Sequence, residues 1–297
     1  MTRGFKSHAR LRLGALACAC LLLSGCGIKL AYNNADRLMR WWASDYVTFT
    51  AEQRAYFDLA FAEVHYWHRT SQLPIYRDGL LRLADALGSD PETALVAFEA
   101  EIEGWGETMS ARAAPVAIAM LASLSAAQVD DLERRMARSN RDYERDARKP
   151  PAAVTREYAK DYADGMKRFV GRLDRDQRAL IESRLATLTP DAQAWLDLRL
   201  ELQSRMLAAL RAEPVDRAVL EALMLDFESL YGPELEAIMA TNEGIFRRLT
   251  VDLLGALTPR QRQHLDDRLR EWAQICAELH DEAEPAAPPA APAAVAT

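Results

Sequence analysis

The sequence predicts an all-α protein, folded as a single multi-helix, bundle-like domain of about eight to ten helices. Apolar residues recur at intervals of three and four along nearly the whole chain, which is the period of a helix with one buried face. No stretch alternates polar and apolar residues between turn signals, as a half-buried strand would. The 297 residues are also enough to bury a sizeable core.

The first 25 residues have the composition of a secretory signal. Four basic residues precede an apolar run, Leu13 to Leu23, that is too short to remain in a bilayer as a permanent span. The run ends at Leu23-Ser24-Gly25-Cys26, which resembles the lipobox of bacterial lipoproteins. That resemblance implies cleavage of residues 1–25 by the lipoprotein signal peptidase, and acyl chains on Cys26 that anchor the helical domain, residues 26–283, to a membrane.

The residue after the lipobox cysteine indicates which membrane that is. Retention in the inner membrane of enteric bacteria typically uses Asp at this position, and here it is Gly27. The resemblance therefore implies an outer-membrane lipoprotein that faces the periplasm. Several acyl chains together hold such a protein firmly, whereas one chain binds only marginally.

The charge of the chain argues against nucleic acid as a partner. Four of the 37 basic residues and none of the 44 acidic residues lie in 1–25, so the mature chain would carry 33 basic and 44 acidic residues, a net charge of −11. A body this acidic repels phosphate backbones and anionic lipid alike. Membrane attachment is therefore expected through the lipid anchor and not through a basic surface.

The cysteines predict a fold without disulfides. Cys18 and Cys20 leave with the signal and Cys26 is acylated, so only Cys276 remains in the mature chain. Cys276 lies on an apolar stripe with the neighbouring Leu and Trp residues of the last helix. It is expected to be a small buried apolar residue and not a nucleophile.

Apolar stripes at helical spacing locate the helices in chain order, and the last one is the clearest. The stripes are Phe57, Phe61, Val64 and His68; Val129, Leu132, Met136 and Tyr143; Tyr158, Tyr162, Met166 and Phe169; Trp195, Leu198, Leu202 and Met206, with Leu196, Leu200, Leu207 and Leu210 beside it; and Leu265, Leu269, Trp272, Cys276 and Leu279. The two parallel stripes in the helix near Leu200 predict a central helix with neighbours on both sides.

Helix breaks separate these stripes. Gly88-Ser89-Asp90-Pro91 supplies a stop, a cap and a proline for the first helical position, and Pro150-Pro151, Pro214 and Gly232-Pro233 punctuate the remainder. From residue 284 to residue 297 the chain is almost entirely Ala and Pro, a composition that builds no core and predicts a disordered tail.

One short pattern opens several of the predicted helices. FTAEQ at Phe49, LSAAQ at Leu124, LDRDQ at Leu173 and LTPRQ at Leu257 each place a Thr, Ser or Asp three residues before a Gln. This is a capping box, in which the N-cap side chain and the Gln side chain each bond the other residue's backbone amide. LTPDAQ at Leu188 has its Gln one residue late, so that box is expected to be imperfect.

The same pattern supports a resemblance. LTxxQ motifs at the starts of amphipathic helices mark the Spy/CpxP-type periplasmic proteins, which are small helical chaperones and envelope-stress sensors. Over most of the mature chain the sequence is more similar to an uncharacterised family of bacterial all-helical lipoproteins. The residues that carry this similarity are the lipobox, Tyr32-Asn33, Trp41-Trp42, Asp45-Tyr46-Val47, FTAEQ, Trp67-His68-Arg69 and Leu73-Pro74. The resemblance to that family implies no established activity.

His65 and His68 are the residues that offer metal chemistry. Spaced three apart, they project from neighbouring positions on one helix face and, with a carboxylate, would suit zinc or copper. The H-E-x-x-H pattern of a zinc protease is missing. Because His68 also continues the stripe of Phe57, Phe61 and Val64, a buried histidine with a hydrogen-bond partner explains it without a metal.

Aromatic residues are concentrated around this helix. Tyr56, Phe57, Phe61, Tyr66 and Trp67, with Trp41 and Trp42 upstream, are expected to belong to the core, and a ligand pocket would be sought here first. Arg69 is expected to pair with a buried acid and fix the register of two helices.

The remaining patterns favour a non-catalytic role. There is no G-x-S-x-G, no phosphate-binding glycine loop and no C-x-x-C, and the charged run from Glu133 to Lys149 mixes both signs as a solvated helix face does. The prediction is an envelope lipoprotein, not an enzyme and without a cofactor, that binds or scaffolds an envelope protein through an unknown site. The alternatives are a Spy/CpxP-like chaperone or stress sensor, and a metal-binding protein that uses His65 and His68.

Overall fold

The computed structural model describes residues 25–283, and every regular element in this range is helical. The elements are α2 (Gly25–Asn33), α3 (Ala35–Ser44), α4 (Ala51–Trp67), η1 (His68–Gln72), α5 (Leu73–Ala86), α6 (Pro91–Ala122), α7 (Ala126–Ala147), α8 (Pro151–Val170), α9 (Arg175–Leu185), α10 (Ala192–Arg211), α11 (Arg217–Leu225), η2 (Phe227–Leu230), α12 (Pro233–Gly255) and α13 (Pro259–Asp281). The all-α prediction is confirmed. The helices outnumber the expected eight to ten because short ones such as α2, α3 and α11 have no long apolar stripe.

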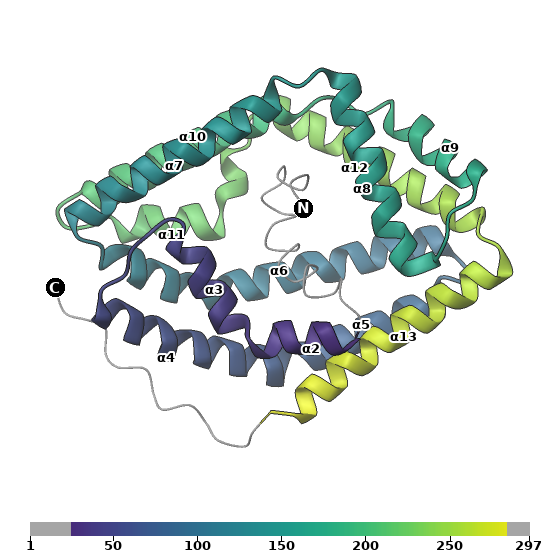
Figure 1. Ribbon diagram of the computed structural model, residues 1–297, viewed down its shortest axis with the longest axis horizontal. Helices are drawn as coiled ribbons and strands as arrows, with labels where there is room; N and C mark the ends of the chain where they lie inside the picture. The colour runs from purple at the N-terminus through teal and green to yellow at the C-terminus, as the bar shows by residue number, and fades with distance from the viewer. Residues whose placement is uncertain (1–24, 284–297) are drawn as a thin grey trace.

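The helices follow one another around a ring (Figure 1). α4, α5 and α6 form one long side, and α7 and α10 run together along the opposite side. α8, α9 and α12 turn the chain at one end, and α13 returns along α5. The expected breaks are confirmed, since Asp90 caps α6 ahead of Pro91, and Pro151 and Pro233 open α8 and α12.

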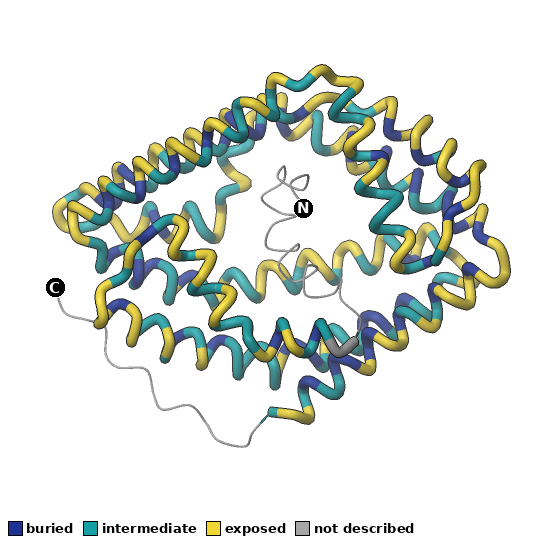
Figure 2. Tube along the Cα trace, viewed as in Figure 1, coloured by how far each residue is buried: buried dark blue, intermediate teal, exposed yellow. Residues whose placement is uncertain are grey.

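Two apolar clusters hold most of the core, one toward each end of the ring. The larger joins α5, α8, α9, α12 and α13 around Leu173, Leu185 and Leu249, which are fully buried. The second joins α6, α7, α10 and α11 around Val129, Leu132 and Leu220. A small third cluster connects α10 to α12. Buried stretches face the neighbouring helices in Figure 2, and exposed ones turn outward.

The predicted stripes are largely the buried faces. All five residues of the Leu265 stripe are buried, Cys276 included, and burial raises the pKa of the Cys276 thiol to about 11. α10 buries residues from both of its stripes, as expected for a central helix, although Leu200 stays exposed. The Tyr158 stripe is only half-buried.

α4 passes into α5 through a single π-helical segment, His68–Gln72. Pro74 explains it, because proline has no backbone N–H and its ring collides with the carbonyl four residues earlier in an α-helix. A wider turn before Pro74 relieves that collision without ending the helix. The segment carries His68 and Arg69 in the wider turn.

No single described helix is long and apolar enough to cross a bilayer. By length and composition alone, α6 and α7 pass that test as a pair, with a bend of 115° between them.

Gly79 on α5 lies directly against α6, and its substitution is a test of how tightly the two helices pack. A Cβ there would lie 2.6 Å from the Trp105 ring, which Tyr76 and Phe98 hold in place. Gly79→Ala is therefore expected to lower the free energy of unfolding by about 1–3 kcal/mol, although Ala is the better helix former. Urea unfolding measures this change.

Gly106 on α6 is the matched control. It is exposed in mid-helix and a Cβ there meets nothing within 4 Å. Gly106→Ala is expected to stabilise the protein by about 0.5–1 kcal/mol through helix propensity. If both substitutions stabilise equally, the contact between α5 and α6 at Gly79 is not tight.

Candidate functional site

The starts of α4 and α7 meet at one end of the ring and form what we call the first junction. Thr50 Oγ1 accepts from the Gln53 amide, and Gln53 Oε1 accepts from the Thr50 amide at 3.0 Å. Ser125 and Gln128 repeat the same box at the start of α7. Both capping boxes predicted from the sequence are therefore confirmed.

The two glutamines of the first junction also bond each other. The side-chain amide of Gln53 donates to Gln128 Oε1 at 3.2 Å, and that of Gln128 donates to Gln53 Oε1 at 2.8 Å. Each amide also donates to a carbonyl two residues before the partner's N-cap, of Ser123 and Thr48 respectively, at 2.9 Å. Each Gln thus caps its own helix and clamps the partner's loop.

A second junction joins the starts of α9 and α13 in the same way. Asp174 with Gln177 and Thr258 with Gln261 form the capping boxes, and the two Gln side chains exchange hydrogen bonds of 2.9 Å. Their amides again reach the carbonyls two residues before the partner's cap, of Ala256 and Arg172. Both Gln side chains are buried here.

The two junctions lie at opposite ends of the long axis of the ring (Figure 1). Each joins helices whose glutamines are far apart in sequence, by 75 residues in the first and 84 in the second. The apolar residue before each cap packs on the core, as a staple requires, and Leu173 and Leu257 are buried. The repeated motif is thus the device that closes the ring at both ends.

The fifth copy, LTPDAQ, forms no capping box. α10 begins at Ala192 with Asp191 at the N-cap and no side-chain capping bond. Thr189 instead exchanges backbone hydrogen bonds with the Asn242 side chain of α12, and Gln193 bonds Asp197 along its own helix. Because its Gln lies one residue later than in the other copies, LTPDAQ does not cap its helix with a capping box, as the spacing predicted.

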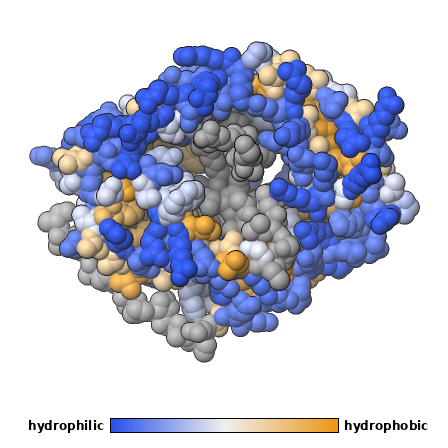
Figure 3. All heavy atoms as spheres, viewed as in Figure 1, coloured by the Kyte–Doolittle hydropathy of each residue, from blue (hydrophilic) through white to orange (hydrophobic). Residues whose placement is uncertain are grey.

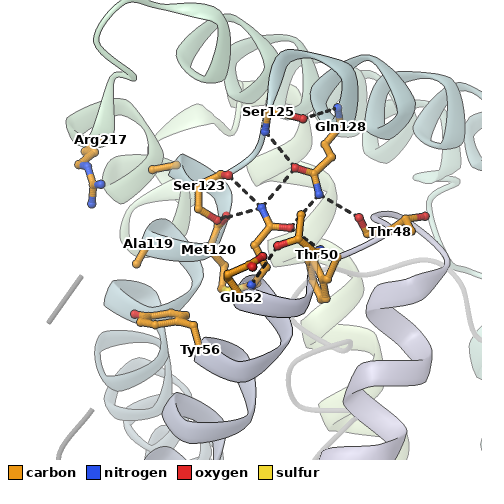
Figure 4. Close-up of a pocket in the computed structure, with 13 residues that line it drawn as sticks. Thr48, Thr50, Glu52, Tyr56, Ala119, Met120, Ser123, Ser125, Gln128 and Arg217 are labelled. Atoms are coloured by element: carbon orange, nitrogen blue, oxygen red, sulfur yellow. Dashed lines mark hydrogen bonds between the residues drawn. The ribbon is translucent and has the colours of Figure 1, made fainter. Parts of the chain in front are cut away.

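A pocket of about 580 Å³ opens beside the first junction (Figure 4). Its lining comes from α4, from the end of α6, from the start of α7 and from α11. The lining residues are Thr48, Phe49, Thr50, Glu52, Gln53, Tyr56, Ala119, Met120, Ala122, Ser123, Ser125, Gln128 and Arg217. Of the aromatic residues among which a pocket was sought, only Tyr56 lines this one, and the remaining lining residues lie outside that group.

The polar groups of this pocket are mostly engaged with each other. The Thr50 and Ser125 hydroxyls accept from backbone amides, and the two Gln side chains bond across the junction. The pKa of Glu52 lies below its usual value because a backbone amide and Thr50 bond the carboxylate. Arg217 is exposed, lines the pocket and, within residues 25–283, forms no ion pair. The pocket therefore offers an apolar wall with a cation at its rim.

A second cluster surrounds Tyr32, which α2 buries against the π-helical segment. Its hydroxyl and His68 Nδ1 lie 2.8 Å apart, and its ring packs against His65 with a centroid distance of 4.6 Å. Arg69 stacks over the same ring at 5.1 Å and donates to Asn33. Residues 32–33 and 68–69, which belong to separate groups in the sequence, thus form one contact.

His68 is the histidine with a hydrogen-bond partner that the stripe predicted, and that partner is Tyr32. Burial, helped by the charge of Arg69, lowers the pKa of His68 to about 4 and lowers that of His65 as well. His65 Nε2 is buried without a hydrogen-bond partner. Among the described residues no group of three or more His, Cys, Asp or Glu side chains could hold a metal ion.

Two expectations about this region are wrong. Arg69 bonds Asn33 and Tyr32 where a buried acid was expected, because the adjacent helix α2 presents an amide and a ring there. Trp41 and Trp42 are 69% and 48% exposed and not in the core, because α3 buries none of its residues. Phe57 and Phe61 are half-buried and stack in series with His65.

The charged run of α7 was expected to be a solvated face, but several of its residues also reach other elements, such as Glu133, which pairs with Arg211 on α10. Arg135 donates to the Ser44 carbonyl and to Thr48 Oγ1, which fixes the loop between α3 and α4 on α7. Arg134 and Arg145 form exposed ion pairs within the helix, as mixed charge predicts. No local pattern marks Arg135, since its partners lie about ninety residues earlier.

Some predicted features lie outside the described residues. These are the signal segment up to residue 24, the Cys26 side chain and the Ala/Pro segment 284–297. The lipid anchor and the disordered tail therefore stay predictions.

Comparison with known proteins gives a family and no activity. No curated protein and no solved structure matches the chain. The family of unknown function DUF6279 matches residues 45–236, which run from the loop before α4 into the start of α12 and include the first junction and its pocket. This match covers more than half of the chain, and the protein therefore belongs to that family.

Proposed function

We propose that this chain is an envelope lipoprotein, anchored through Cys26 in the outer membrane and facing the periplasm, with a non-catalytic binding or scaffolding role. The observation that carries the binding role is the pocket at the first junction. The Thr50 and Ser125 hydroxyls and the two Gln amides are held by hydrogen bonds, while an apolar wall and the exposed Arg217 guanidinium stay open to a partner. Such a lining suits recognition of an apolar segment with a nearby acidic group.

The anchor is tested by the mass of the protein extracted from membranes. The expected product starts at Cys26 and carries a diacylglyceryl group and an amide-linked acyl chain. Cys26→Ser is expected to abolish cleavage and acylation, whereas Cys276→Ser, which changes a buried cysteine of α13, leaves both intact. An unmodified Cys26 in the wild-type protein refutes the anchor.

The binding role is tested by photo-cross-linking in the native envelope. A benzoylphenylalanine at Tyr56, inside the pocket, is compared with one at Gln193, which is exposed on α10. One stoichiometric partner captured only from position 56 supports the proposal. Equal capture from both positions, or no capture, refutes recognition through this pocket.

A Spy/CpxP-like chaperone or stress sensor is the alternative, and the four LTxxQ-like starts are the observation that favours it. A chaperone would cross-link to a broad range of envelope proteins, increasingly under stress. Suppression of aggregation of an unrelated unfolded protein by the purified lipoprotein would support this alternative. The junctions weaken it, because they give these motifs a role in holding helices together.

Metal binding through His65 and His68 is a further alternative. Tyr32 occupies Nδ1 of His68, so a metal would have to displace that bond or use Nε2. Zinc uptake by the purified protein that is lost in His65→Ala would support it, and absence of uptake would end it.

A further inference from the structure

α3 carries an apolar face that the described chain covers only in part, where Trp42 packs against Tyr46 with a ring-centroid distance of 5.4 Å. None of its residues is buried, and Leu38, Trp41 and Trp42 are all exposed. Spaced by three and four residues, they lie on one side of the helix. Leu30, on the preceding helix α2, is exposed as well. In Figure 3 apolar atoms reach the near surface over α2 and α3.

The polar side of α3 fixes which way this face points. Arg40 pairs with Asp36 on its own helix and with Asp58 on α4. These ion pairs hold the polar side of α3 toward the body. The two tryptophans follow on the other side of α3, where they are 69% and 48% exposed.

Two adjacent exposed tryptophans indicate a binding surface. Large rings left in water lose the favourable free energy of burial, and contiguous apolar patches mark sites of interaction. An amphipathic helix with Trp on its apolar side suits the headgroup region of a bilayer, where the indole ring is buried and its N–H stays hydrated.

We propose that the outer face of α3, with Leu38, Trp41 and Trp42, lies in the headgroup region of the phospholipid bilayer. This proposal rests on the proposed acylation of Cys26 and adds a second, non-covalent contact to it. The protein would then sit on the membrane in one fixed orientation, with α3 against the lipid.

The chain between Cys26 and Trp41 is short, so α3 must lie near the membrane to which Cys26 is attached. Trp41 follows Cys26 by fifteen residues, all in α2, α3 or the single residue between them. At 1.5 Å per residue the helical path covers at most about 22 Å. A bilayer that holds acyl chains at Cys26 is therefore within reach of α3.

Charge makes a small contribution to this surface. Arg37 is exposed and unpaired within residues 25–283, but Asp36 and Asp45 lie close in sequence and the protein as a whole is acidic. The contact is consequently apolar and aromatic. It is expected on zwitterionic vesicles and to be insensitive to salt.

The test uses the full-length lipoprotein, with acylation of Cys26 first verified by intact mass. It is reconstituted into phosphatidylcholine vesicles that contain lipids brominated near the headgroup, which quench only nearby tryptophans. Trp41 and Trp42 are two of six tryptophans, so quenching of about a third of the emission is expected. Trp41→Phe/Trp42→Phe is expected to abolish it, while Trp195→Phe on α10 leaves the quenched amount unchanged.

The outcomes separate the anchor from the contact. An acylated protein whose emission is not quenched refutes the contact and leaves the anchor standing. A protein without acyl chains refutes both. Cross-linking of position 41 to a second copy of the chain, in an acylated protein without quenching, would assign the face to a dimer and also overturn this proposal.

Discussion

Gln177→Glu is expected to lower the free energy of unfolding by about 3 kcal/mol. A glutamate still completes the capping box with Asp174, but it has no N–H groups to donate to Gln261 and to the Ala256 carbonyl. Its carboxyl oxygen would face these two acceptors at a position only 2% exposed. Each buried polar group left without a partner costs about 1–3 kcal/mol. The shift of the urea midpoint measures the loss.

Two further variants identify the cause of this loss. Gln193→Glu, on exposed α10, changes the same chemistry outside a junction and is expected to change stability by less than about 0.5 kcal/mol. Gln53→Glu, in the less buried first junction, is expected to lie between the two. If Gln177→Glu is as mild as the exposed change, helix capping alone explains the motif and the cross-junction bonds contribute nothing.

Acid is expected to destabilise the protein through His68. Its pKa is lowered to about 4 in the folded protein from an ordinary 6.5, so the unfolded chain binds the proton more readily. Keeping His68 neutral in the folded protein costs no stability above about pH 6.5, where the ring is neutral in both states. As the pH falls from 6.5 toward 4, the unfolded chain takes up the proton and the free energy of unfolding decreases. Between pH 7 and pH 4.5 this decrease in the free energy of unfolding amounts to about 2 kcal/mol. His65, whose pKa is also lowered by burial, acts in the same direction.

His68→Gln isolates this contribution. Glutamine keeps an acceptor for the Tyr32 hydroxyl but does not titrate, so the loss of unfolding free energy from pH 7 to pH 4.5 is expected to shrink by about 2 kcal/mol. His264→Gln, on an exposed position of α13, is expected to leave the pH dependence as in the wild type. Identical profiles for all three proteins would show that His68 titrates normally.

The helix starts were predictable because a capping box is local. Thr50 with Gln53, or Thr258 with Gln261, lie within one turn, and both the box and its displaced form at Thr189 follow from spacing. The pairing of the boxes was not predictable from spacing, since the partners are 75 and 84 residues apart. One signal does exist in the sequence. Glutamate caps as well as glutamine, yet all four boxes use glutamine, the residue with N–H groups to donate.

The Tyr32 cluster and the exposed Trp pair show the other limit of sequence reasoning. The apolar stripe predicted that His68 is enclosed, but its partner comes from α2, before the stripe begins. Trp41 and Trp42 looked like core residues because burial is the usual state of tryptophan. Only the structure shows that α3 contacts α4 through its polar side, by the ion pair of Arg40 with Asp58.

The order in which the ring closes follows from where the glutamines lie in the chain. During synthesis or export the first junction can form once Gln128 has emerged, whereas the second must wait for Gln261. Until then Gln177 lacks its partner, and the face of α5 that α13 covers is open to water. A fragment trimmed to the family limits, residues 45–236, would stay in that unfinished state. α13 is therefore the helix that locks the ring.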